Sequence, residues 1–330
     1  MLLDIYKINL QLFADLNTNV TSDAGLSVEN KTHYDMTLID EAAPNLVHDQ
    51  FGQKRPIPKN GGKKIEFRKF ASLPKATAPL TEGVTPDGKK LSVTAIEAEV
   101  AQYGDYIVQS DVLELTTIDN TIVEATKILG RQAGLTLDTI TRNILQAGTN
   151  VYYCPKADGT AVTSRAALDN TCKLTVDVIK RCVAIMKKNN APKIDGSYVM
   201  IIHPFVAYDV MSDPEWRYPH QYQDTTNIYE GEIGKIAGVR FVETSEAKVY
   251  EGGVFASLLI ADGAYGVTEI TGGGLTTIIK QKGSAGTADP LDQRSSIGWK
   301  AIKTAEILVQ PYLMRIESKS ALSGEITEAN

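Results

Sequence analysis

An apolar stripe that repeats every three or four residues is the feature that most constrains the fold of this chain. It runs from Ile118 to Ile144, and this spacing places it on one face of an α-helix. The sequence therefore predicts a helix over residues 117–147. Thr116 or Thr117 is suited to cap the start of this helix, and Gly148 to end it. At 1.5 Å per residue the helix is a rod on the order of 45 Å long.

The stripe also predicts which side chains of this helix are buried. Leu129 and Leu137 belong to the stripe, so we expect both to face a core. Lys127 and Arg142 are polar neighbours that we expect on the opposite, exposed face. Gly130 and Gly134 lie inside the helix at some cost in helix propensity, and they allow either a bend or the close approach of another backbone.

Regular elements of both kinds follow this helix. Thr175 is placed to cap a second helix that ends near Lys187 and Lys188, whose charges suit a helix carboxyl end. The residues from Tyr198 to His203 have the composition of a short buried strand. The last third of the chain holds several strand-like runs separated by glycine-rich turns. Helices followed by strands predict an α+β fold.

Residues 51–109 have the pattern of two strands joined by a long tip. Alternating apolar residues around Phe67 predict the first strand, and a second alternating run follows turn-forming residues. The faces of this hairpin are too polar to bury much surface alone, so it needs a partner surface. Its basic cluster is suited to contact phosphates or, as an equal alternative, acidic groups of a neighbouring subunit. These interface candidates are Lys54, Arg55, Lys63, Lys64, Arg68 and Lys69.

The composition limits the class of protein. Of the 330 residues, 43% are hydrophobic and 22% are charged, which is ordinary for a globular protein. The net charge of −6 argues against a sequence-specific DNA reader, which usually has a basic surface, but permits a container for nucleic acid. No run approaches the roughly 20 apolar residues of a membrane span, so we expect no membrane partner.

The reactive side chains form no recognisable catalytic or metal-binding pattern. The chain has four histidines and three cysteines, with no C-x-x-C pair and no second His or Cys three or four residues from any histidine. The nucleophile elbow, the phosphate-binding loop and the dinucleotide fingerprint are also missing from the sequence. We expect His203 to be structural rather than a general base, and the cysteines to be small buried side chains. The sequence therefore predicts no catalytic residue, metal or cofactor.

Three phrases stand out in the second half of the chain. The first, Y-E-G-E-I-G-K-I-A-G-V-R-F-V-E-T-S-E-A at residues 229–247, predicts a glycine-rich turn and then a buried strand. Taken alone, this phrase fits an α+β enzyme equally well, because folds do not dictate functions. The others are H-P-F-V-A-Y-D-V-M-S-D-P-E-W at residues 203–216 and D-P-L-D-Q-R-S-S-I-G-W-K at residues 289–300.

In this order, the phrases resemble those of tailed-phage major capsid proteins, and the likeness is closest to a podophage-type subfamily. The resemblance spans nearly the whole chain and implies the Johnson (HK97-like) capsid fold. Its fold-signature positions here are Gly231, Gly234, Gly238, Asp289, Gln293, Arg294 and Trp299. By this resemblance, the chain comprises an N-terminal arm (1–50), an extended hairpin loop (51–109), a peripheral domain (110–195) with the spine helix, an axial domain (196–300), a return strand of the peripheral domain (301–322) and a C-terminal tail (323–330).

The resemblance also implies a function and partners. Copies would assemble as hexamers and pentamers into an icosahedral shell around double-stranded DNA, so the protein would lie in the virion after assembly in the host bacterial cytoplasm. It would use a separate scaffolding protein and a portal, and would bind DNA non-specifically if at all. Two alternatives stay open on sequence: the shell of an encapsulin nanocompartment, and a cytoplasmic α+β enzyme with an unrecognised site.

Overall fold

The computed structural model describes residues 18–19, 47–58, 60, 62–70, 73–80, 82–85, 87–116, 121–216, 234–269, 275–284, 289–325 and 329–330. The expected N-terminal arm over residues 1–50 therefore lies outside the described residues, apart from 18–19 and 47–50.

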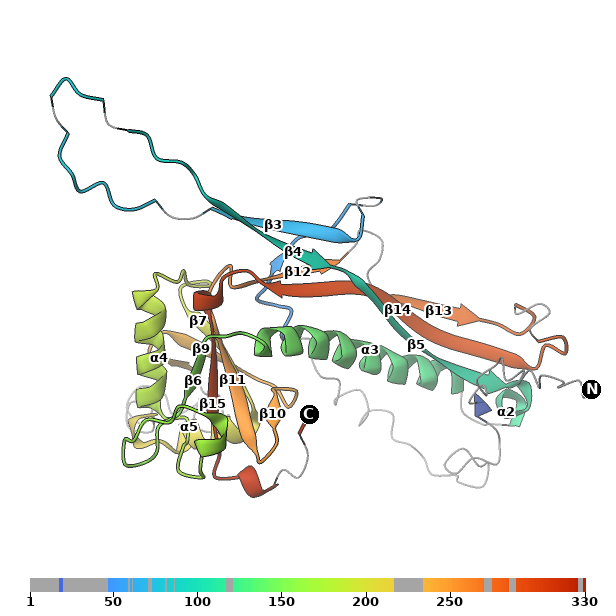
Figure 1. Ribbon diagram of the computed structural model, residues 1–330. Helices are drawn as coiled ribbons and strands as arrows, with labels where there is room; N and C mark the ends of the chain where they lie inside the picture. Colours follow the sequence, from blue (N-terminus) through green and yellow to red (C-terminus); the bar gives the residue numbers. More distant parts are fainter. Residues whose placement is uncertain are drawn as a thin grey trace, which may run out of the picture. The chain divides into compact units, whose positions relative to one another are not determined.

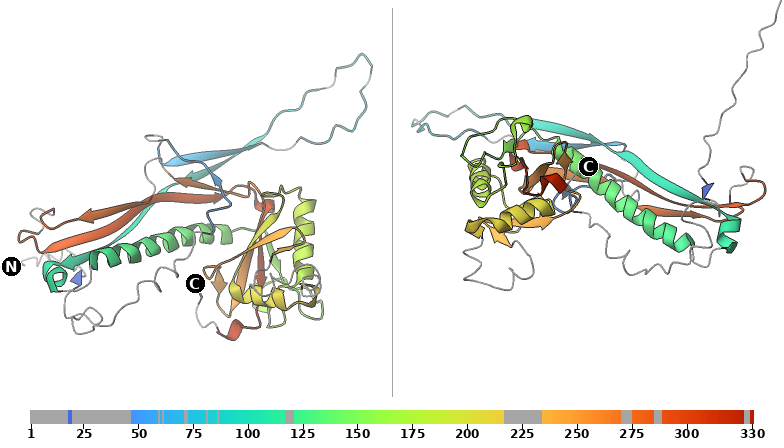
Figure 2. Two further views of the ribbon diagram at one scale, coloured as in Figure 1. Left: turned by 180° about the vertical axis from the view of Figure 1, so that it is seen from behind. Right: turned by 90° about the horizontal axis from the view of Figure 1, so that it is seen from below.

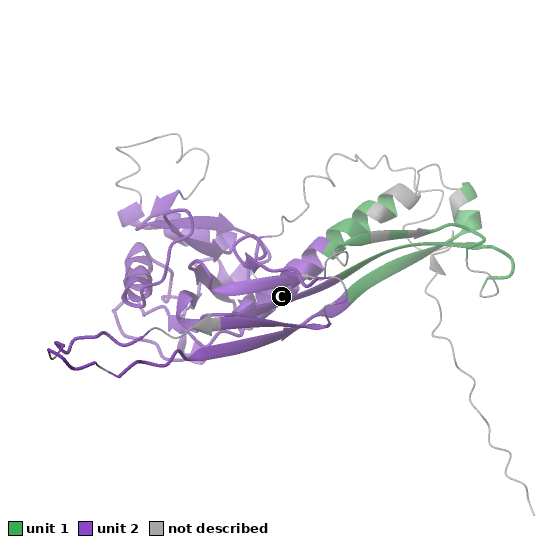
Figure 3. Cartoon of the chain, turned by 90° about the horizontal axis from the view of Figure 1, so that it is seen from above, with its two compact units in different colours: residues 1–43, 103–133, 275–301 green, residues 44–102, 134–274, 302–330 purple. Residues whose placement is uncertain are grey.

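The chain divides into two compact units (Figure 3). Unit 1 holds residues 1–43, 103–133 and 275–301, and unit 2 holds residues 44–102, 134–274 and 302–330. The boundary falls inside three continuous elements, β5 (Ala101–Ser110), α3 (Thr121–Gln146) and β14 (Arg294–Ile307), so each of them contributes residues to both units.

Unit 2 is built around a seven-stranded sheet in the order β6-β15-β11-β7-β9-β8, with β10 paired to β11. The pairing is mixed, because β7 is antiparallel to β11 and parallel to β9, while β15 is parallel to β6. The strands are β6 (Val151–Tyr153), β7 (Tyr198–Ile202), β8 (Lys235–Ile236), β9 (Val239–Glu243), β10 (Val249–Tyr250), β11 (Val254–Ile260) and β15 (Leu313–Ser318). The strand predicted at residues 198–203 and the strand predicted in the second part of the phrase at residues 229–247 are thus confirmed as β7 and β9.

Both faces of this sheet are covered, and for that reason β7 and β11 are apolar along their whole length. On one face, Met200 and Leu259 pack with the buried stripe of α4 (Val176–Lys188) and with α5 (Pro204–Ser212). Figures 1 and 2 show α4 beside these strands. On the other face, Ile201 and Leu258 pack with Leu145 near the end of α3. Successive side chains of each strand therefore point to opposite faces of the sheet and pack into two separate cores.

The predicted second helix is confirmed as α4. It begins after Thr175, whose hydroxyl accepts a hydrogen bond from the backbone NH of Val178 at 3.4 Å, and it ends at Lys188. The next helix, α5, begins directly after β7 and has Pro204 in its first turn.

The predicted long helix is also present, with a later start. α3 has 26 residues, a length of about 39 Å. Thr116 does not cap it, because Thr116 ends a separate short helix, α2 (Asp111–Thr116), that begins after Ser110. The hydroxyl of Ser110 accepts a hydrogen bond from the NH of Leu113 at 3.3 Å, which starts helical structure ten residues before α3.

The long strand β14 alternates between a buried and a more exposed face. The buried positions are the odd-numbered residues from Ser295 to Ile307, together with Gly298. In unit 1, β14 pairs with β13 (Thr276–Lys280) in a sheet that includes β5 and the two residues of β1 (Thr18–Asn19). In unit 2 it pairs with β12 (Tyr265–Glu269), which in turn pairs with β2 (Gln53–Lys54).

The remaining strands form the predicted hairpin in unit 2. β3 (Lys64–Phe70) and β4 (Val93–Glu99) pair in antiparallel register from Lys64 opposite Glu99 to Phe70 opposite Val93. The loop between them extends beyond the ends of both strands (Figure 1). Short 3-10 turns lie at Arg165–Ala167, Gln310–Tyr312 and Ser323–Glu325. Helices and mixed sheets in one chain confirm the α+β class.

Candidate assembly surface

The base of the hairpin is held to unit 2 by one aromatic contact. Phe67 of β3 is only 4% exposed. A Cβ atom added at Gly266 of β12 would lie 2.8 Å from the Phe67 ring, which is closer than side chains pack. Glycine at this position therefore lets the ring lie directly on the β12 backbone. Among the described residues of β3 and β4, the buried side chains are Phe67 and Ala98, both at the root, and the faces beyond them are exposed.

The basic interface candidates lie around this root, and several have acidic partners within the chain. Nζ of Lys64 lies 3.4 Å from the Glu97 carboxylate, and Nε of Arg68 lies 3.0 Å from Glu66. Such exposed pairs add little stability. Lys54, Arg55, Lys63, Lys64 and Arg68 are all exposed, while the side chain of Lys69 lies outside the described residues. The sequence reasoning did not foresee that the hairpin neutralises part of its own charge.

The hairpin loop carries exposed apolar side chains that the sequence analysis treated only as turn chemistry. Leu80 is 77% exposed and Val84 is 63% exposed, and they flank the exposed Glu82. Leu73 and Leu91 are also more than half exposed. Exposed apolar residues grouped on one projecting segment are typical of an interaction site.

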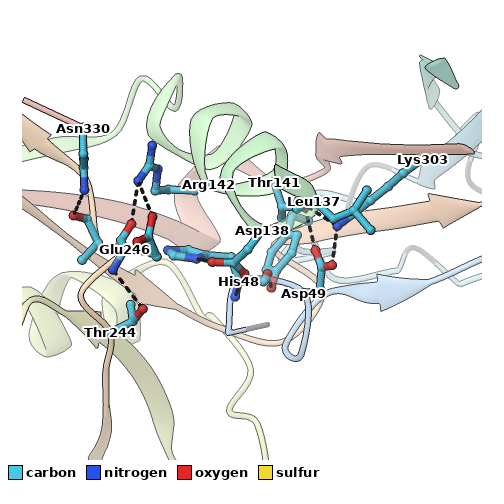
Figure 4. Close-up of polar contacts among 12 residues, drawn as sticks. His48, Asp49, Leu137, Asp138, Thr141, Arg142, Thr244, Glu246, Lys303 and Asn330 are labelled. Carbon is cyan, nitrogen blue, oxygen red and sulfur yellow. Dashed lines mark hydrogen bonds and ion pairs between the residues drawn. The ribbon is translucent and has the colours of Figure 1, made fainter. Parts of the chain in front are cut away.

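A buried ion pair fixes the segment from which the hairpin starts (Figure 4). Nζ of Lys303 pairs with the carboxylate of Asp49 and also donates a hydrogen bond to the carbonyl oxygen of Leu137 at 3.0 Å. The hydroxyl of Thr141 donates to the same carboxylate at 2.6 Å. Lys303 occupies a core-facing position of β14, and its ammonium is satisfied there by these partners.

His48 ties the same segment to α3 and β12. Its backbone NH and its Nδ1 atom contact the two carboxylate oxygens of Asp138 at 2.8 and 2.7 Å. The hydroxyl of Tyr265 donates a hydrogen bond to the His48 carbonyl oxygen at 2.5 Å. Burial raises the pKa of Tyr265, which keeps this phenol protonated as a donor. Residues 47–51 are therefore held by α3, β12 and β14 just before the hairpin begins.

The expectation that Arg142 lies on an exposed polar face is wrong. Arg142 is only 3% exposed, and its guanidinium donates a hydrogen bond to the backbone carbonyl oxygen of Glu246 at 2.8 Å. Burial lowers the pKa of Arg142, and the carboxylates of Glu246 and Asp138 oppose that shift. Residues 137–146 of α3 are buried on more than one side, so the buried surface is wider than the single apolar stripe.

The described glycines and Asp289 of the fold signature lie in turns or next to strand ends. Gly234 and Gly238 have φ angles of 72° and 81°, the left-handed region that favours glycine. Asp289 is buried and accepts a hydrogen bond from the backbone NH of Arg294 at 2.8 Å, and the carbonyl oxygen of Gln293 accepts one from Asp111. Gly231 lies outside the described residues.

In unit 1, Trp299 is buried against α3. Its indole NH donates to the side-chain oxygen of Gln132 at 3.3 Å, and Gln132 also donates to Asp105 at 2.7 Å. Trp299 is therefore a packing residue of the strand–helix layer in this unit.

The candidate reactive residues have structural roles. Nδ1 of His203 accepts a hydrogen bond from the backbone NH of Phe205 at 3.1 Å and caps α5, as expected for a structural histidine. Burial lowers the pKa of His203 to about 4. Cys154, Cys172 and Cys182 are all buried, and burial raises the pKa of Cys182 to about 12. These thiols have the character of small core side chains.

Within the described parts of the chain, no three His, Cys, Asp or Glu side chains are grouped to hold a metal ion. The described helices also include none long and apolar enough to cross a membrane.

The comparisons with known proteins agree with this geometry. Residues 121–274 match the family described as phage capsid protein. No curated protein matches the chain. Among solved structures, the capsid protein of cyanophage P-SCSP1u is similar with a TM-score of 0.67 and 14% identity, over 84% of this chain and 89% of that chain.

Two further capsid structures align over most of the chain. The cyanophage Pam1 capsid has a TM-score of 0.66 and 13% identity, over 94% of this chain and 100% of that chain. The capsid of Ralstonia phage GP4 has a TM-score of 0.62 and 13% identity, over 100% of each chain. At such low identity these likenesses show the fold, which is the HK97-like capsid fold. Within that fold, residues 121–274 carry the match to the phage capsid protein family, so the chain resembles tailed-phage major capsid proteins both in fold and in this segment of sequence.

Proposed function

We propose that copies of this protein assemble as hexamers and pentamers into an icosahedral shell that encloses the double-stranded DNA of a tailed phage or prophage. The observation that carries this proposal is the match of residues 121–274 to the phage capsid protein family, within a chain that has the capsid fold along most of its length. The protein is then a structural component of the virion, and its main partner is itself.

The finer features of this role are part of the proposal. We infer that assembly takes place in the host bacterial cytoplasm with the help of a separate scaffolding protein and a portal, and that the protein catalyses no reaction. The domain limits implied by the family resemblance are also proposed, with the hairpin of residues 51–109 as the extended loop that lies over an adjacent subunit. The exposed loop of that hairpin and its buried root at Phe67 and Ala98 support this arrangement, because in the described part of β3, β4 and the loop the buried side chains lie at the root.

Neither alternative role gains support from the structure or the comparisons. The family match and the structures that we compared are those of phage capsids. His203, the one histidine that the sequence suggested as a general base, is used as a helix cap.

The test is the size of the assembled particle. The protein is expressed alone and together with a scaffolding protein encoded beside it, and the products are sized by light scattering and imaged by electron microscopy. We expect closed shells or ring-shaped capsomers in at least one of the two preparations. Monomers or small oligomers in both preparations contradict the proposal.

A further inference from the structure

A shallow cleft lies at the root of the hairpin in unit 2. It has a volume of about 280 Å³ and is lined by Arg55, Phe67, Arg68, Ile96, Leu308 and Val309, among others. We call it the hairpin cleft. Four of its lining residues, Phe67, Ile96, Leu308 and Val309, are apolar and together are called its apolar floor, and Arg55 and Arg68 add two guanidinium groups. This volume is below the ~300–1,000 Å³ typical of pockets that enclose a small molecule, so the hairpin cleft suits one or two side chains of a protein segment.

The charge of the hairpin cleft defines its partner. Arg55 is exposed, and its guanidinium lies 5.8 Å from the centroid of the Phe67 ring. Among the described residues the structure gives Arg55 no carboxylate partner, whereas Arg68 is paired with Glu66. An anionic side chain between apolar neighbours would complement Arg55 and the floor together.

The chain itself presents such a segment. We call residues 76–86, A-T-A-P-L-T-E-G-V-T-P, the loop tip, and Glu82 is the only charged residue in it. Leu80 and Val84 stand on either side of Glu82, and all three side chains are exposed. The loop tip therefore offers a carboxylate between two apolar groups, which is the pattern that the hairpin cleft requires.

The loop tip is positioned to reach another copy of the chain. Each arm between β3 or β4 and the middle of the loop has about eleven residues, enough to span roughly 35 Å when extended. The loop leads away from the strands that line the cleft (Figure 1). We propose that the loop tip of one subunit occupies the hairpin cleft of a second copy, with Glu82 facing Arg55 and with Leu80 and Val84 on the apolar floor.

This contact rests on the proposed assembly and has a geometric consequence. Each copy gives one loop tip and receives another, so the contact is head-to-tail and repeats around a ring. The same pair of surfaces is compatible with rings of five or of six copies, because both ring sizes repeat the same head-to-tail contact.

Charge exchange tests the pairing. Glu82→Arg and Arg55→Glu each place like charges in a contact that every copy repeats, so we expect each variant to lower the yield of shells at least about tenfold at fixed protein concentration. The combined variant restores opposite charges and should recover most of the wild-type yield. Asp87→Lys is the matched control, because it reverses an acidic residue of the same loop outside the loop tip, and it should assemble as wild type. Unchanged melting of the unassembled subunits confirms that the variants fold.

Cross-linking gives a second readout. A chain with Glu82→Cys and Arg55→Cys should form disulfides between copies after mild oxidation of shells, seen as a ladder of covalent multimers on a denaturing gel. The native thiols are buried and contribute little background.

The outcomes separate this inference from the proposed function. If the wild-type chain forms no shells, the proposed function fails. If wild-type shells form and Glu82→Arg shells form equally well, the pairing alone is overturned. Loss of assembly in Arg55→Glu without any effect of Glu82→Arg also overturns it, because the hairpin cleft would then serve a different occupant.

Discussion

The buried pair of Lys303 and Asp49 allows the sharpest test of how the hairpin segment is fixed. We consider Lys303→Met, which keeps most of the apolar stem and removes the ammonium group. The Lys303 side chain is 7% exposed and the Asp49 side chain is 19% exposed. In the variant, the hydroxyl of Thr141 is the one hydrogen-bond donor left to the Asp49 carboxylate among the described residues, and the Leu137 carbonyl oxygen loses the lysine donor.

The expected loss of unfolding free energy follows from the Asp49 carboxylate, which is left without its lysine partner. Removing one partner of a buried ion pair costs about 3–5 kcal/mol, since the other charge stays buried without compensation. Asp49 keeps some contact with solvent, so we expect about 2–4 kcal/mol for Lys303→Met. With a urea m value of about 2–3 kcal/mol/M, the unfolding midpoint should fall by roughly 1 M.

The assay is urea unfolding of unassembled subunits, with two comparisons. Lys300→Met changes an exposed lysine of the same strand, so its effect should stay within about 0.5 kcal/mol. Asp49→Asn combined with Lys303→Met should cost less than the sum of the single changes, by about 1 kcal/mol or more, because the two side chains form one interaction. Equal midpoints for Lys303→Met and Lys300→Met, or strict additivity in the double variant, would refute the reasoning.

Two further predictions concern α3 and α5. Leu129 is 4% exposed, so Leu129→Asp should lower the free energy of unfolding by several kcal/mol and abolish most soluble yield. Leu137→Ala should lower it by about 2–5 kcal/mol. Lys127→Ala removes a partly exposed ion pair with Glu124 and should melt like wild type, so similar melting of the Leu129 and Lys127 variants would contradict the buried stripe. His203 has its pKa lowered to about 4 by burial, below the ~6.5 of the unfolded chain. The unfolded state then binds more protons between these values, so this histidine destabilises the fold as pH falls from about 6.5 to 4. His203→Asn keeps a side-chain acceptor at this capping position and should flatten the pH dependence of the melting temperature in that window; identical slopes for variant and wild type count against the assignment.

The sequence predicted the elements whose signals are local. The cap at Thr175, the strand at Tyr198 and the alternation around Phe67 all depend on neighbours within a few residues, so periodicity was sufficient. The predicted start of α3 was wrong because Thr116 belongs to the last turn of a separate helix, α2, and α3 begins only at Thr121.

The long-range polar contacts could not be predicted from one sequence. Lys303 meets Asp49 across 254 positions, and nothing in the local pattern names that partner. A partial signal existed, because Lys303 falls on the same alternate positions as Ile297 and Trp299, which face the core. Arg142 was misplaced for a related reason: a single apolar stripe predicts one buried face, whereas residues 137–146 of α3 are enclosed on several. The sequence also does not show that Leu80 and Val84 of the loop tip are exposed, and without that exposure the loop tip cannot be identified as an interaction surface.

The position of β15 in the central sheet sets the time at which a newly made subunit becomes complete. β15 lies between β6 and β11 and pairs Arg315 with Val151, more than 160 residues earlier in the chain. The two cores on either side of the sheet both use residues of β15, so neither closes until residues 313–318 have left the ribosome. At about 5–20 residues per second, the interval between synthesis of β6 and of β15 is roughly 10–30 s. Nascent chains therefore lack a finished subunit body during most of their synthesis.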